Sequence, residues 1–272
     1  MRPEAGQFVT AIVRRDLTVV RRSRAVALPI IILPVVLFVG LPLLLTVALR
    51  LGQSQLAELQ SLIDLLPESI RRLLGEGPLE HQLLTYFLEL QFAALFLIVP
   101  LLVVAVIAAD SFAGEKERKT LEALLYTPTT DVELYIAKLL GPWLAALAVG
   151  VGGYVLYAVT ANVLAAAQMG RLLVVTPLWL LVVLWLGPAV AALGLGVLVQ
   201  ISSRVRGFQE AYQLGGAVVL PVVVLVVAQA AGVLILDALA AFVLGGIIWL
   251  IAGLILWVGF RAFRRESLLL SA

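Results

Sequence analysis

The chain has 272 residues, of which 62% are hydrophobic and 13% are charged, and its formal net charge is +2. Soluble domains are about half apolar and about a quarter charged, so this composition excludes an ordinary soluble protein and predicts a chain that crosses a membrane several times. The chain has no cysteine and one histidine, His81, which excludes disulfides, thiol catalysis and metal sites rich in cysteine or histidine.

Residues 1–25 have the pattern of an amphipathic helix. Arginines fall opposite a set of apolar residues that recur at helical spacing, namely Phe8, Ile12, Val13, Leu17 and Val20. A basic amphipathic helix before a membrane span usually lies in the plane of the lipid head groups, and we expect this segment to do so. The alternative is a positively charged anchor that binds anionic lipid and has no further role.

Six apolar stretches are long enough to cross a membrane, since about 20 apolar residues in a helix span about 30 Å of hydrocarbon. They cover residues 26–49, 85–109, 139–165, 173–200, 212–235 and 239–260. We therefore predict an all-α polytopic membrane protein with a six-helix domain over residues 26–260. The first stretch is not a signal peptide, because it is too long, contains three prolines and lacks a small-residue cleavage site.

Residues 50–84 form the one sizeable segment on the outer side of the predicted spans. Leucines and isoleucines recur near helical spacing until Pro67 interrupts the pattern. We expect two short amphipathic helices that cap the outer mouth or lie on the outer leaflet, with Gly75 and Pro78 near the end of the second. No other metal-ligand residues accompany His81 here, so we interpret it as solvated or interfacial.

The orientation follows from lysine and arginine, because loops on the cytosolic side carry an excess of these residues. Fifteen lie on one side of the predicted spans and four on the other. The fifteen are at the N-terminus, between the second and third spans, between the fourth and fifth spans, and in the tail 261–272. Both termini are therefore expected in the cytosol. Trp143 and Trp257 near cytosolic ends, and Trp179 near an outer end, fit aromatic anchoring at the interfaces.

Residues 110–138 form a charged loop between the second and third spans. We expect a helix from about Ser111 to Tyr126 with one leucine-rich face, ended by Pro128. Thr130 then begins the next helix, with Glu133 as the reciprocal partner of a capping box. A helix, a sharp break and a second helix would form a rigid cytosolic protrusion. The alternative is an ordinary connector stabilised by its own charges.

This loop resembles the segment after the second helix of ABC-2 type permeases, the membrane subunits of ATP-driven exporters. The shared pattern is G-E-x-x-x-x-T-L-E-x-L-L-x-x-P, and Lys119 departs from the glycine usual in the family. The resemblance implies a coupling helix that meets the ATPase subunit. The residues expected at that surface are Gly114, Glu115, Lys116, Glu117, Arg118, Thr120, Leu121, Glu122, Leu125 and Pro128.

A second segment, residues 202–213, is similar to the S-x-x-x-R-x-F-x-E-A-x-Q stretch before the fifth span of sodium-export and related permeases. It implies a second cytosolic loop with functional residues at Arg204, Arg206, Phe208 and Glu210. The alternative is a positively charged turn that only sets the orientation.

The last four spans favour an energy source outside the membrane. Residues 139–170, 172–203 and 211–236 contain no Asp, Glu, Lys or Arg, whereas ion-coupled transporters need ionisable groups at membrane depth. Glu89 and Asp237 lie near outer ends, where we expect them to be interfacial. The chain also lacks a phosphate-binding loop, because GEKERKT at 114–120 has no second glycine and no preceding strand. ATP and Mg²⁺ are therefore expected in a separate subunit and no cofactor in this chain.

A few polar residues lie within the spans and are candidates for a substrate path: Gln91, Tyr154, Tyr157, Asn162, Gln213 and Gln229. Such a sparse set suits an amphiphilic or apolar cargo better than a hydrated ion. The alternative is that each residue hydrogen-bonds a neighbouring helix. Pro100, Pro188 and Pro221 lie mid-span and are expected to kink their helices.

The resemblance as a whole implies an exporter permease that works by alternating access in a bacterial or archaeal cytoplasmic membrane. It acts as a dimer, with a second copy or a homologous permease, above two cytosolic ABC ATPase subunits. No nucleic-acid partner is expected. Two alternatives remain: a non-transporting scaffold or assembly factor with a permease-like fold, and an intramembrane enzyme. The second is disfavoured, because the spans hold no grouped Ser/His, Asp/Asp or Glu/His residues.

Overall fold

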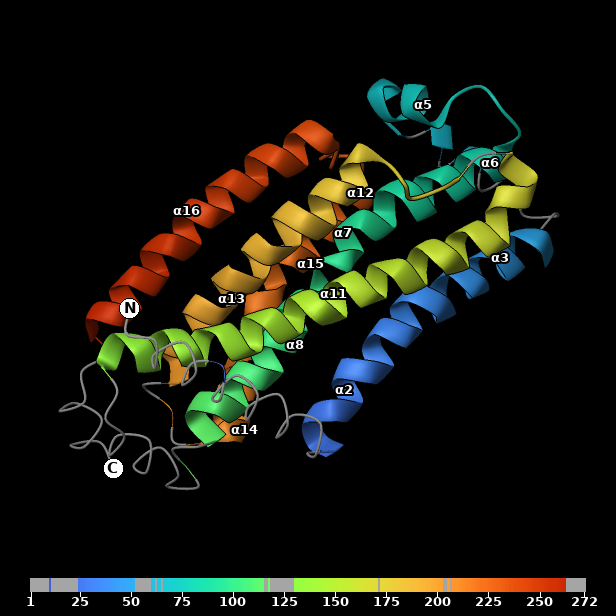
Figure 1. Ribbon diagram of the computed structural model, residues 1–272. Helices are drawn as coiled ribbons and strands as arrows, with labels where there is room; N and C mark the ends of the chain where they lie inside the picture. Colours follow the sequence, from blue (N-terminus) through green and yellow to red (C-terminus); the bar gives the residue numbers. More distant parts are fainter. Residues whose placement is uncertain are drawn as a thin grey trace.

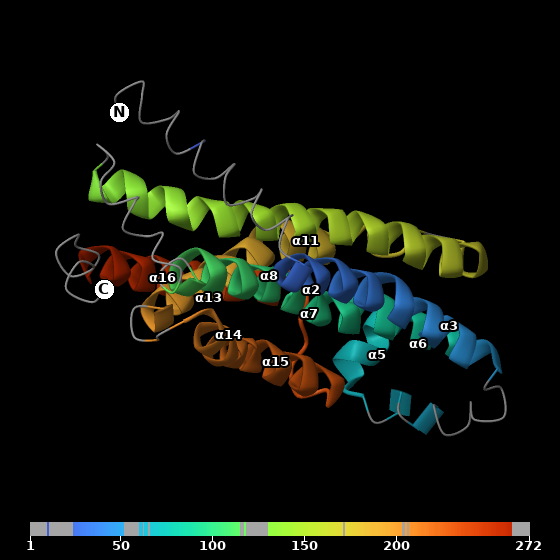
Figure 2. The ribbon, with the colours of Figure 1, turned by 90° about the horizontal axis from the view of Figure 1, so that it is seen from below.

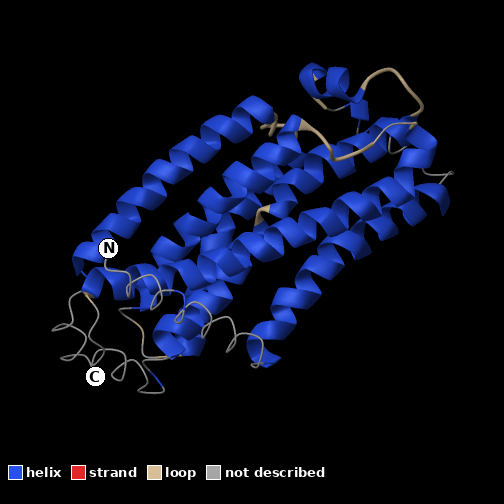
Figure 3. Ribbon diagram, in the orientation of Figure 1, coloured by secondary structure: helices blue, strands red, loops and turns tan. Residues whose placement is uncertain are grey.

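A computed structural model describes residues 10, 24–51, 60–61, 63–64, 66–114, 117, 130–170, 172–202, 205 and 207–262. Throughout this part the regular structure is helical, and Figure 3 shows no strand in it. Six helices are long and apolar enough to cross a membrane: Ala27–Leu49, Leu79–Gly114, Val132–Ala165, Pro177–Ser202, Gln209–Ala230 and Ala238–Arg261. The predicted all-α, six-span architecture is confirmed. Most of the expected N-terminal helix and of the tail 261–272 lies outside the described residues.

Each span except the third and sixth is built from several helical pieces. The first comprises α2 (Arg24–Val35), η1 (Val36–Gly40) and α3 (Leu41–Leu51). The second comprises α6 (Leu79–Leu84), η3 (Thr85–Gln91), α7 (Phe92–Phe96), α8 (Ile98–Ala109) and η4 (Asp110–Gly114). The third is α11 (Asp131–Met169). The fourth comprises α12 (Pro177–Leu181), η5 (Val182–Leu186) and α13 (Gly187–Ser202). The fifth comprises α14 (Phe208–Gly216), η6 (Ala217–Val219) and α15 (Leu220–Ala230), and the sixth is α16 (Ala238–Ala262).

The bundle has two ends, shown in Figure 1. We call "inner" the end where α2 begins, η4 ends and α11 begins, which the charge pattern predicts to face the cytosol, and "outer" the opposite end. Figure 2 shows α11 on one face of the helices that include α8 and α13, with α14 and α15 on the other face. Spans two and four form the centre of the bundle. In the most apolar 18-residue stretch of each, 83% and 78% of the residues are buried, against 17% in spans five and six.

The three mid-span prolines each sit beside an irregular stretch of helix. Proline lacks the N–H that would bond the carbonyl four residues earlier, so the helix before it must adjust. Pro100 follows the break at Leu97, Pro188 follows the π-helix η5, and Pro221 follows the 3₁₀-helix η6. Each of the three prolines therefore has a local change of helix type beside it, and the kinks expected from sequence stay a prediction.

The outer segment packs its apolar side against the bundle. Helix α5 (Glu68–Leu74) begins after Pro67 and ends at Gly75, whose φ of 73° is in the left-handed region that favours glycine. Ile70 is buried, and Pro67 lies so close to Gly232 that a Cβ there would be 2.8 Å from the proline Cδ. Helix α6 then joins η3 directly, so the second span begins at Leu79, within the expected 50–84 segment.

Spans four and six approach each other closely through small residues. A Cβ added at Gly245 would lie 2.5 Å from the Trp185 indole, whereas one added at the neighbouring Gly246 would meet nothing within 4 Å. Trp185 also donates its indole N–H to the Phe242 carbonyl at 3.0 Å. Glycine at 245 is therefore needed for this contact, in line with the role of small residues between membrane helices.

This pair of glycines gives a matched test of packing. We expect Gly245→Ala to lower the free energy of unfolding by about 1–3 kcal/mol, because the methyl group overpacks the site. Gly246→Ala should leave stability unchanged or raise it by up to about 1 kcal/mol, because alanine is the better helix former. Unfolding of the purified protein in a detergent titration, followed by tryptophan fluorescence, measures both. Equal losses in the two variants would contradict the close approach.

Candidate functional site

The start of α11 is fixed by the expected capping box. The Glu133 side chain accepts from the Thr130 backbone N–H at 3.0 Å, and Thr130 Oγ1 accepts from the Glu133 N–H at 3.3 Å. This reciprocal pair satisfies two donors that the first turn of a helix leaves without intrahelical partners. The prediction for these two residues is confirmed, and α11 begins as a well-defined helix directly after the charged loop.

Lys138 joins α11 to the inner end of the second span. Its side chain is 1% exposed, and Nζ donates to the Ser111 carbonyl at 2.7 Å. The ammonium also lies 5.3 Å from the centre of the Phe112 ring. A charged donor bonded to a buried carbonyl is one of the stronger hydrogen bonds in proteins. Lys138 therefore holds together the two helices that flank the charged loop.

The charged loop also meets the connection between spans four and five. A Cβ added at Gly207 would lie 2.7 Å from Glu117 Oε2, so the Glu117 carboxylate packs directly on the Gly207 backbone. Small buried residues from both segments form one cluster beneath this contact: Ala109, Ala113, Val205 and Ala211. We call these contacts, together with the Lys138 bond and the capping box, the inner junction. It brings together the two segments that the sequence pattern singled out separately.

The structure places only some of the expected coupling residues. Gly114 is buried at the end of η4, and Glu117 is exposed beside Gly207. Phe208 begins α14, and Glu210 is exposed in its first turn. The remaining residues lie outside the described part of the chain: Glu115, Lys116, Arg118, Thr120, Leu121, Glu122, Leu125, Pro128, Arg204 and Arg206.

Two hydrogen bonds fasten span six to this inner end. Tyr135 in the second turn of α11 donates its hydroxyl to the Leu256 carbonyl at 3.0 Å. Gln200 of α13 donates to the Ile255 carbonyl at 3.5 Å. Gly259 permits the approach, because a Cβ there would be 2.8 Å from the Tyr135 hydroxyl oxygen. The first two turns of α11 thus contact spans two and six together.

Farther along the bundle, three consecutive carbonyls of η3 accept hydrogen bonds from three different spans. The Leu88 carbonyl accepts from the Tyr157 hydroxyl at 2.6 Å, and the Glu89 carbonyl accepts from Trp179 Nε1 at 3.1 Å. The Leu90 carbonyl accepts from Gln229 Nε2 at 2.6 Å. A π-helix displaces the usual backbone pairing and makes carbonyls available to side chains. We call these three carbonyls and their donors the η3 carbonyl site.

Stacked aromatic rings surround the η3 carbonyl site. Tyr157 stacks on Phe92 with ring centres 5.4 Å apart, and its ring centre lies 4.9 Å from that of Trp179. Phe38 of η1 and Phe96 stack at 5.6 Å on the same cluster. Trp179 is 0% exposed, so its interpretation as an interfacial anchor was wrong. It is instead a central packing residue of α12, because Phe96 of span two and Tyr154 and Tyr157 of span three pack against its ring.

Glu89 was also expected at an interface, and the structure buries it. Its side chain is 9% exposed, within a span that runs from Leu79 to Gly114.

Asp237, by contrast, is exposed and accepts from the Ala240 backbone N–H at 2.7 Å, which caps the start of α16. Trp257 is half-exposed, and the Arg261 guanidinium lies 3.6 Å from its ring centre, which fits an interfacial position.

Two glutamines clasp span two to span five. Gln91 Nε2 donates to the Val226 carbonyl at 3.1 Å, while Gln229 Nε2 donates in the reverse direction to Leu90. Both side chains are buried, and the side-chain oxygens of both have no hydrogen-bond partner. Since a carbonyl requires a donor, the NH₂ groups must face these carbonyls and the amide oxygens must point elsewhere.

The other residues of the expected substrate path do not join this cluster through hydrogen bonds. Tyr154 donates to the Val174 carbonyl at 3.0 Å, although its ring stacks on Trp179. Asn162 bonds the Leu173 backbone through both ends of its amide and so shapes the turn after α11. Gln213 is exposed on α14 near the inner end. The structure thus brings Gln91, Tyr157 and Gln229 together, places Tyr154 beside them through Trp179, and leaves Asn162 and Gln213 apart.

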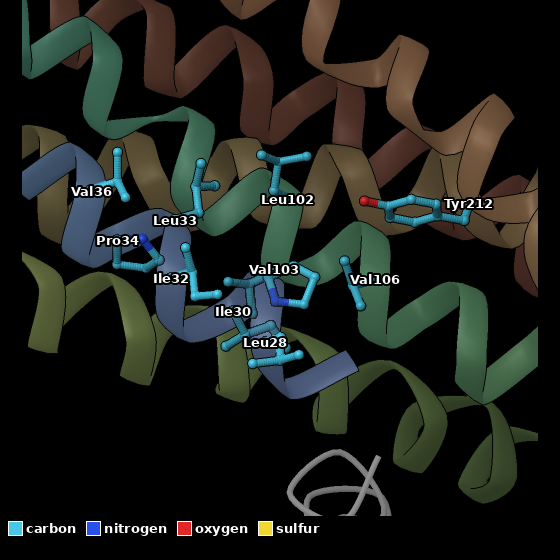
Figure 4. A pocket seen from close by; sticks show the side chains of 11 residues that line it. Leu28, Ile30, Ile32, Leu33, Pro34, Val36, Leu102, Val103, Val106 and Tyr212 are labelled. Atoms are coloured by element: carbon cyan, nitrogen blue, oxygen red, sulfur yellow. The ribbon is translucent and has the colours of Figure 1, made fainter. Parts of the chain in front are cut away.

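An apolar pocket of about 410 Å³ lies between the first, second and fifth spans in the inner half of the bundle. Figure 4 shows Leu28, Leu33 and Val36 of the first span on one side, Val103 and Val106 of α8 beside them, and Tyr212 at the far end. Tyr212 supplies the only polar side chain among the lining residues. The pocket therefore suits apolar groups and offers a single hydroxyl.

These features define a class of protein. Within the described residues no group of three or more His, Cys, Asp or Glu side chains could hold a metal ion. Six apolar helices instead surround buried polar contacts between spans, and a charged loop is anchored at one end. This is an integral, multi-pass α-helical membrane protein.

The family model of the ABC-2 family transporter protein matches residues 10–266. The chain belongs to this family and is a membrane permease of an ABC transporter, and members of this family are transport components that associate with an ABC ATPase. The expected ABC-2 family is confirmed, and the sodium-export subgroup stays a prediction. No curated protein matches the chain.

Proposed function

We propose that the chain is the membrane-spanning subunit of an ABC exporter, which moves its substrate outward by alternating access. A separate ATPase binds and hydrolyses ATP with Mg²⁺. Two copies of that ATPase and a second permease, identical or homologous, complete the transporter. The inner end faces the cytosol, as the distribution of lysine and arginine predicts.

The observation that carries this proposal is the inner junction. The loop with the family's ATPase-contact pattern lies between η4 and α11, and Lys138 bonds these two flanks to each other. A force applied to the loop would therefore move spans two and three together. Tyr135 extends the same connection to span six.

Helix α11 is suited to carry such a movement across the membrane. It runs without a break for 39 residues, which corresponds to about 58 Å. Lys138 lies in its second turn, and Tyr157 farther along donates to the η3 carbonyl site. One continuous helix, with Pro142 inside it, thus connects the loop flank with the π-helical part of span two, where irregular segments give the bundle places to bend.

Co-purification tests the proposal. The tagged protein is extracted from native membranes in detergent, and its partners are identified by mass spectrometry. We expect a stoichiometric ABC ATPase, and a second related permease if the transporter is a heterodimer. A pure preparation without an ATPase would contradict the proposed complex and favour the scaffold.

The contact with the ATPase can be tested on three residues of the loop, which lie outside the described part of the chain. We expect the combined replacement of Glu115, Leu121 and Glu122 by alanine to reduce permease-dependent stimulation of ATP hydrolysis by roughly 5- to 150-fold, the usual range of coupling between sites. Membrane insertion and thermal stability should stay unchanged. Full stimulation by the triple variant would rule out this loop as the docking surface.

A further inference from the structure

The first span has almost no polar side chain with which it could bond its neighbours. Between Ala27 and Leu49 the one polar side chain is that of Thr46, and it donates to the Pro42 carbonyl of the same span at 2.8 Å. Spans two to six, by contrast, are joined by side-chain hydrogen bonds, such as the three at the η3 carbonyl site and the bond from Tyr135 to span six. The first span is therefore attached to the bundle through apolar packing.

One aromatic side chain anchors the first span. Phe38 is 1% exposed, although only 28% of the residues in the most apolar 18-residue stretch of this span are buried. Its ring stacks on Phe96 of span two with ring centres 5.6 Å apart, and its centre lies 5.8 Å from that of Tyr157 in span three. Phe38 therefore inserts between two spans that are hydrogen-bonded to each other through Tyr157.

Gly153 of α11 provides the space for the Phe38 ring. A Cβ added at Gly153 would lie 2.6 Å from Phe38 Cε2 and 2.9 Å from Phe38 Cδ2, well inside the ~3.5–4.0 Å that separates carbon atoms in contact. The neighbouring Gly152 is exposed, and a Cβ there would meet nothing within 4 Å. We call the Phe38 ring and the space at Gly153 that receives it the first-span latch.

The latch lies where the first span is least regular. Phe38 is the middle residue of the π-helix η1, and Pro34 and Pro42 lie four residues before and after it. Because proline has no N–H, Pro42 cannot form the α-helical bond to the Phe38 carbonyl. Bends in helices concentrate at prolines and at π-helical turns. The two halves of the span, α2 and α3, can therefore change their relative direction at η1.

Helix α2, on the inner side of the latch, forms one wall of the apolar pocket of about 410 Å³. Figure 4 shows its Leu33 and Val36 beside Val103 and Val106 of α8. In Figure 1, α3 lies beside α11, whereas α2 diverges from α11 toward the inner end. Since the side chains on both of these walls are apolar, movement of α2 away from α8 would open the pocket without breaking a hydrogen bond between them.

We propose that the first span is a hinged element, in which α2 moves about η1 and the first-span latch holds it in the docked position of this structure. Release of the latch widens the pocket between spans one, two and five, while spans two to six stay joined. The hinge and the latch belong to the permease by itself. Only the assignment of this movement to the transport cycle rests on the exporter function proposed above.

Spin labels on the full-length permease in lipid nanodiscs test the hinge, because the chain has no cysteine of its own. A cysteine replaces Ile31 on α2 or Leu44 on α3, and each is paired with one at Leu250 on α16; all three positions are exposed. Double electron–electron resonance measures the two distances. In Gly153→Ala the methyl group displaces Phe38, so we expect the ratio of undocked to docked α2 to rise by roughly 5- to 150-fold. The distance from Leu44 should stay unchanged.

Three further variants separate the latch from general packing. Gly152→Ala adds the same methyl group to the exposed side of α11 and should leave both distances unchanged. Phe38→Ala removes the ring, so it should also raise the undocked population, and it replaces Gly153→Ala if that variant fails to fold. Phe38→Leu in the Gly153→Ala background removes the ring edge that meets the new methyl group, and it should restore part of the docked population.

Three results would overturn the proposal. These are a wild-type α2 distance in both Gly153→Ala and Phe38→Ala, an equal change at the α2 and α3 positions, and the same shift in Gly152→Ala. In the complete transporter, a change of the Ile31–Leu250 distance on ATP binding supports a role in the transport cycle, and an unchanged distance overturns that role alone. Absence of an ATPase partner would refute the exporter function and leave the latch measurement valid.

Discussion

Replacing Lys138 by methionine is expected to leave the protein folded and to uncouple it from its ATPase. Methionine fills most of the space of the lysine stem and removes the buried charge, so the expected loss of stability is that of one hydrogen bond to a charged group, about 1.5–3 kcal/mol. The bond from Nζ to the Ser111 carbonyl is lost, so η4 and α11 are no longer held together at the base of the loop. We expect stimulation of ATP hydrolysis to fall by roughly 5- to 150-fold.

Alanine at the same position separates packing from charge. Lys138→Ala leaves a cavity at a side chain that is 1% exposed, and truncations of comparable buried side chains cost about 2–5 kcal/mol. Both variants should therefore lose coupling, and the alanine variant should lose more stability than the methionine variant because it adds a cavity to the lost hydrogen bond. The measurement combines ATPase rates of the reconstituted complex with detergent unfolding of the isolated permease.

A methionine variant with full stimulation would show that the Lys138 bond has a purely structural role. The movement would then have to pass through other contacts of the inner junction, such as Glu117 against Gly207 or Tyr135 with Leu256. Arg261→Ala provides a control for the loss of a positive charge at the inner end, because Arg261 is exposed and contacts Trp257.

The hydrogen bond of Lys138 could not be predicted from the sequence. As one positive charge among fifteen on the predicted cytosolic side, it contributes to orientation like any other. A signal was present, since Lys138 follows Ile136 and Ala137 and precedes a long apolar run. Which carbonyl it reaches depends on how α11 packs against η4, and that contact joins residues far apart in the sequence.

The six spans and the capping box were predictable because both depend on local patterns. The length of an apolar stretch determines whether it can span the membrane, and the spacing of Thr130 and Glu133 determines the capping box at the start of α11. The π-helices were not predictable in the same way. Residues Thr85–Gln91 have no proline or glycine that would mark an irregular helix. Their carbonyls are held by Tyr157, Trp179 and Gln229, which come from three other spans.

A substrate path through the polar residues of the spans stays a prediction, whereas hydrogen bonding between helices, the alternative, is observed for three of them. Gln91, Tyr157 and Gln229 were candidates for a substrate path, with hydrogen bonding between helices as the alternative. In the structure each of these three side chains donates a hydrogen bond to a backbone carbonyl of another span. The oxygens of both glutamines are buried without partners, so only one half of each amide joins the helices.

Truncation of Tyr157 is expected to cause the largest loss of stability at the η3 carbonyl site. The side chain is 0% exposed, stacks on Phe92 and lies against Trp179 and Phe38. Removing a buried aromatic ring of this kind costs about 3–5 kcal/mol. Tyr157→Phe keeps the stacked ring and removes only the bond to the Leu88 carbonyl. Its cost should lie between about 0.6 and 1.7 kcal/mol, the average and the largest value for single hydrogen bonds between membrane helices.

Detergent unfolding followed by tryptophan fluorescence measures both variants, and Val159→Ala on the exposed side of α11 is the matched control, expected within about 0.5 kcal/mol of wild type. Because Tyr157 and Lys138 lie on one continuous helix, the phenylalanine variant should also weaken coupling to the ATPase if α11 carries movement to η3. Unaltered coupling in Tyr157→Phe, together with lost coupling in Lys138→Met, would show that the movement of α11 is not passed on to η3 through Tyr157. The hydrogen bond to Leu88 would then serve only to satisfy a carbonyl that the π-helix leaves without its usual partner.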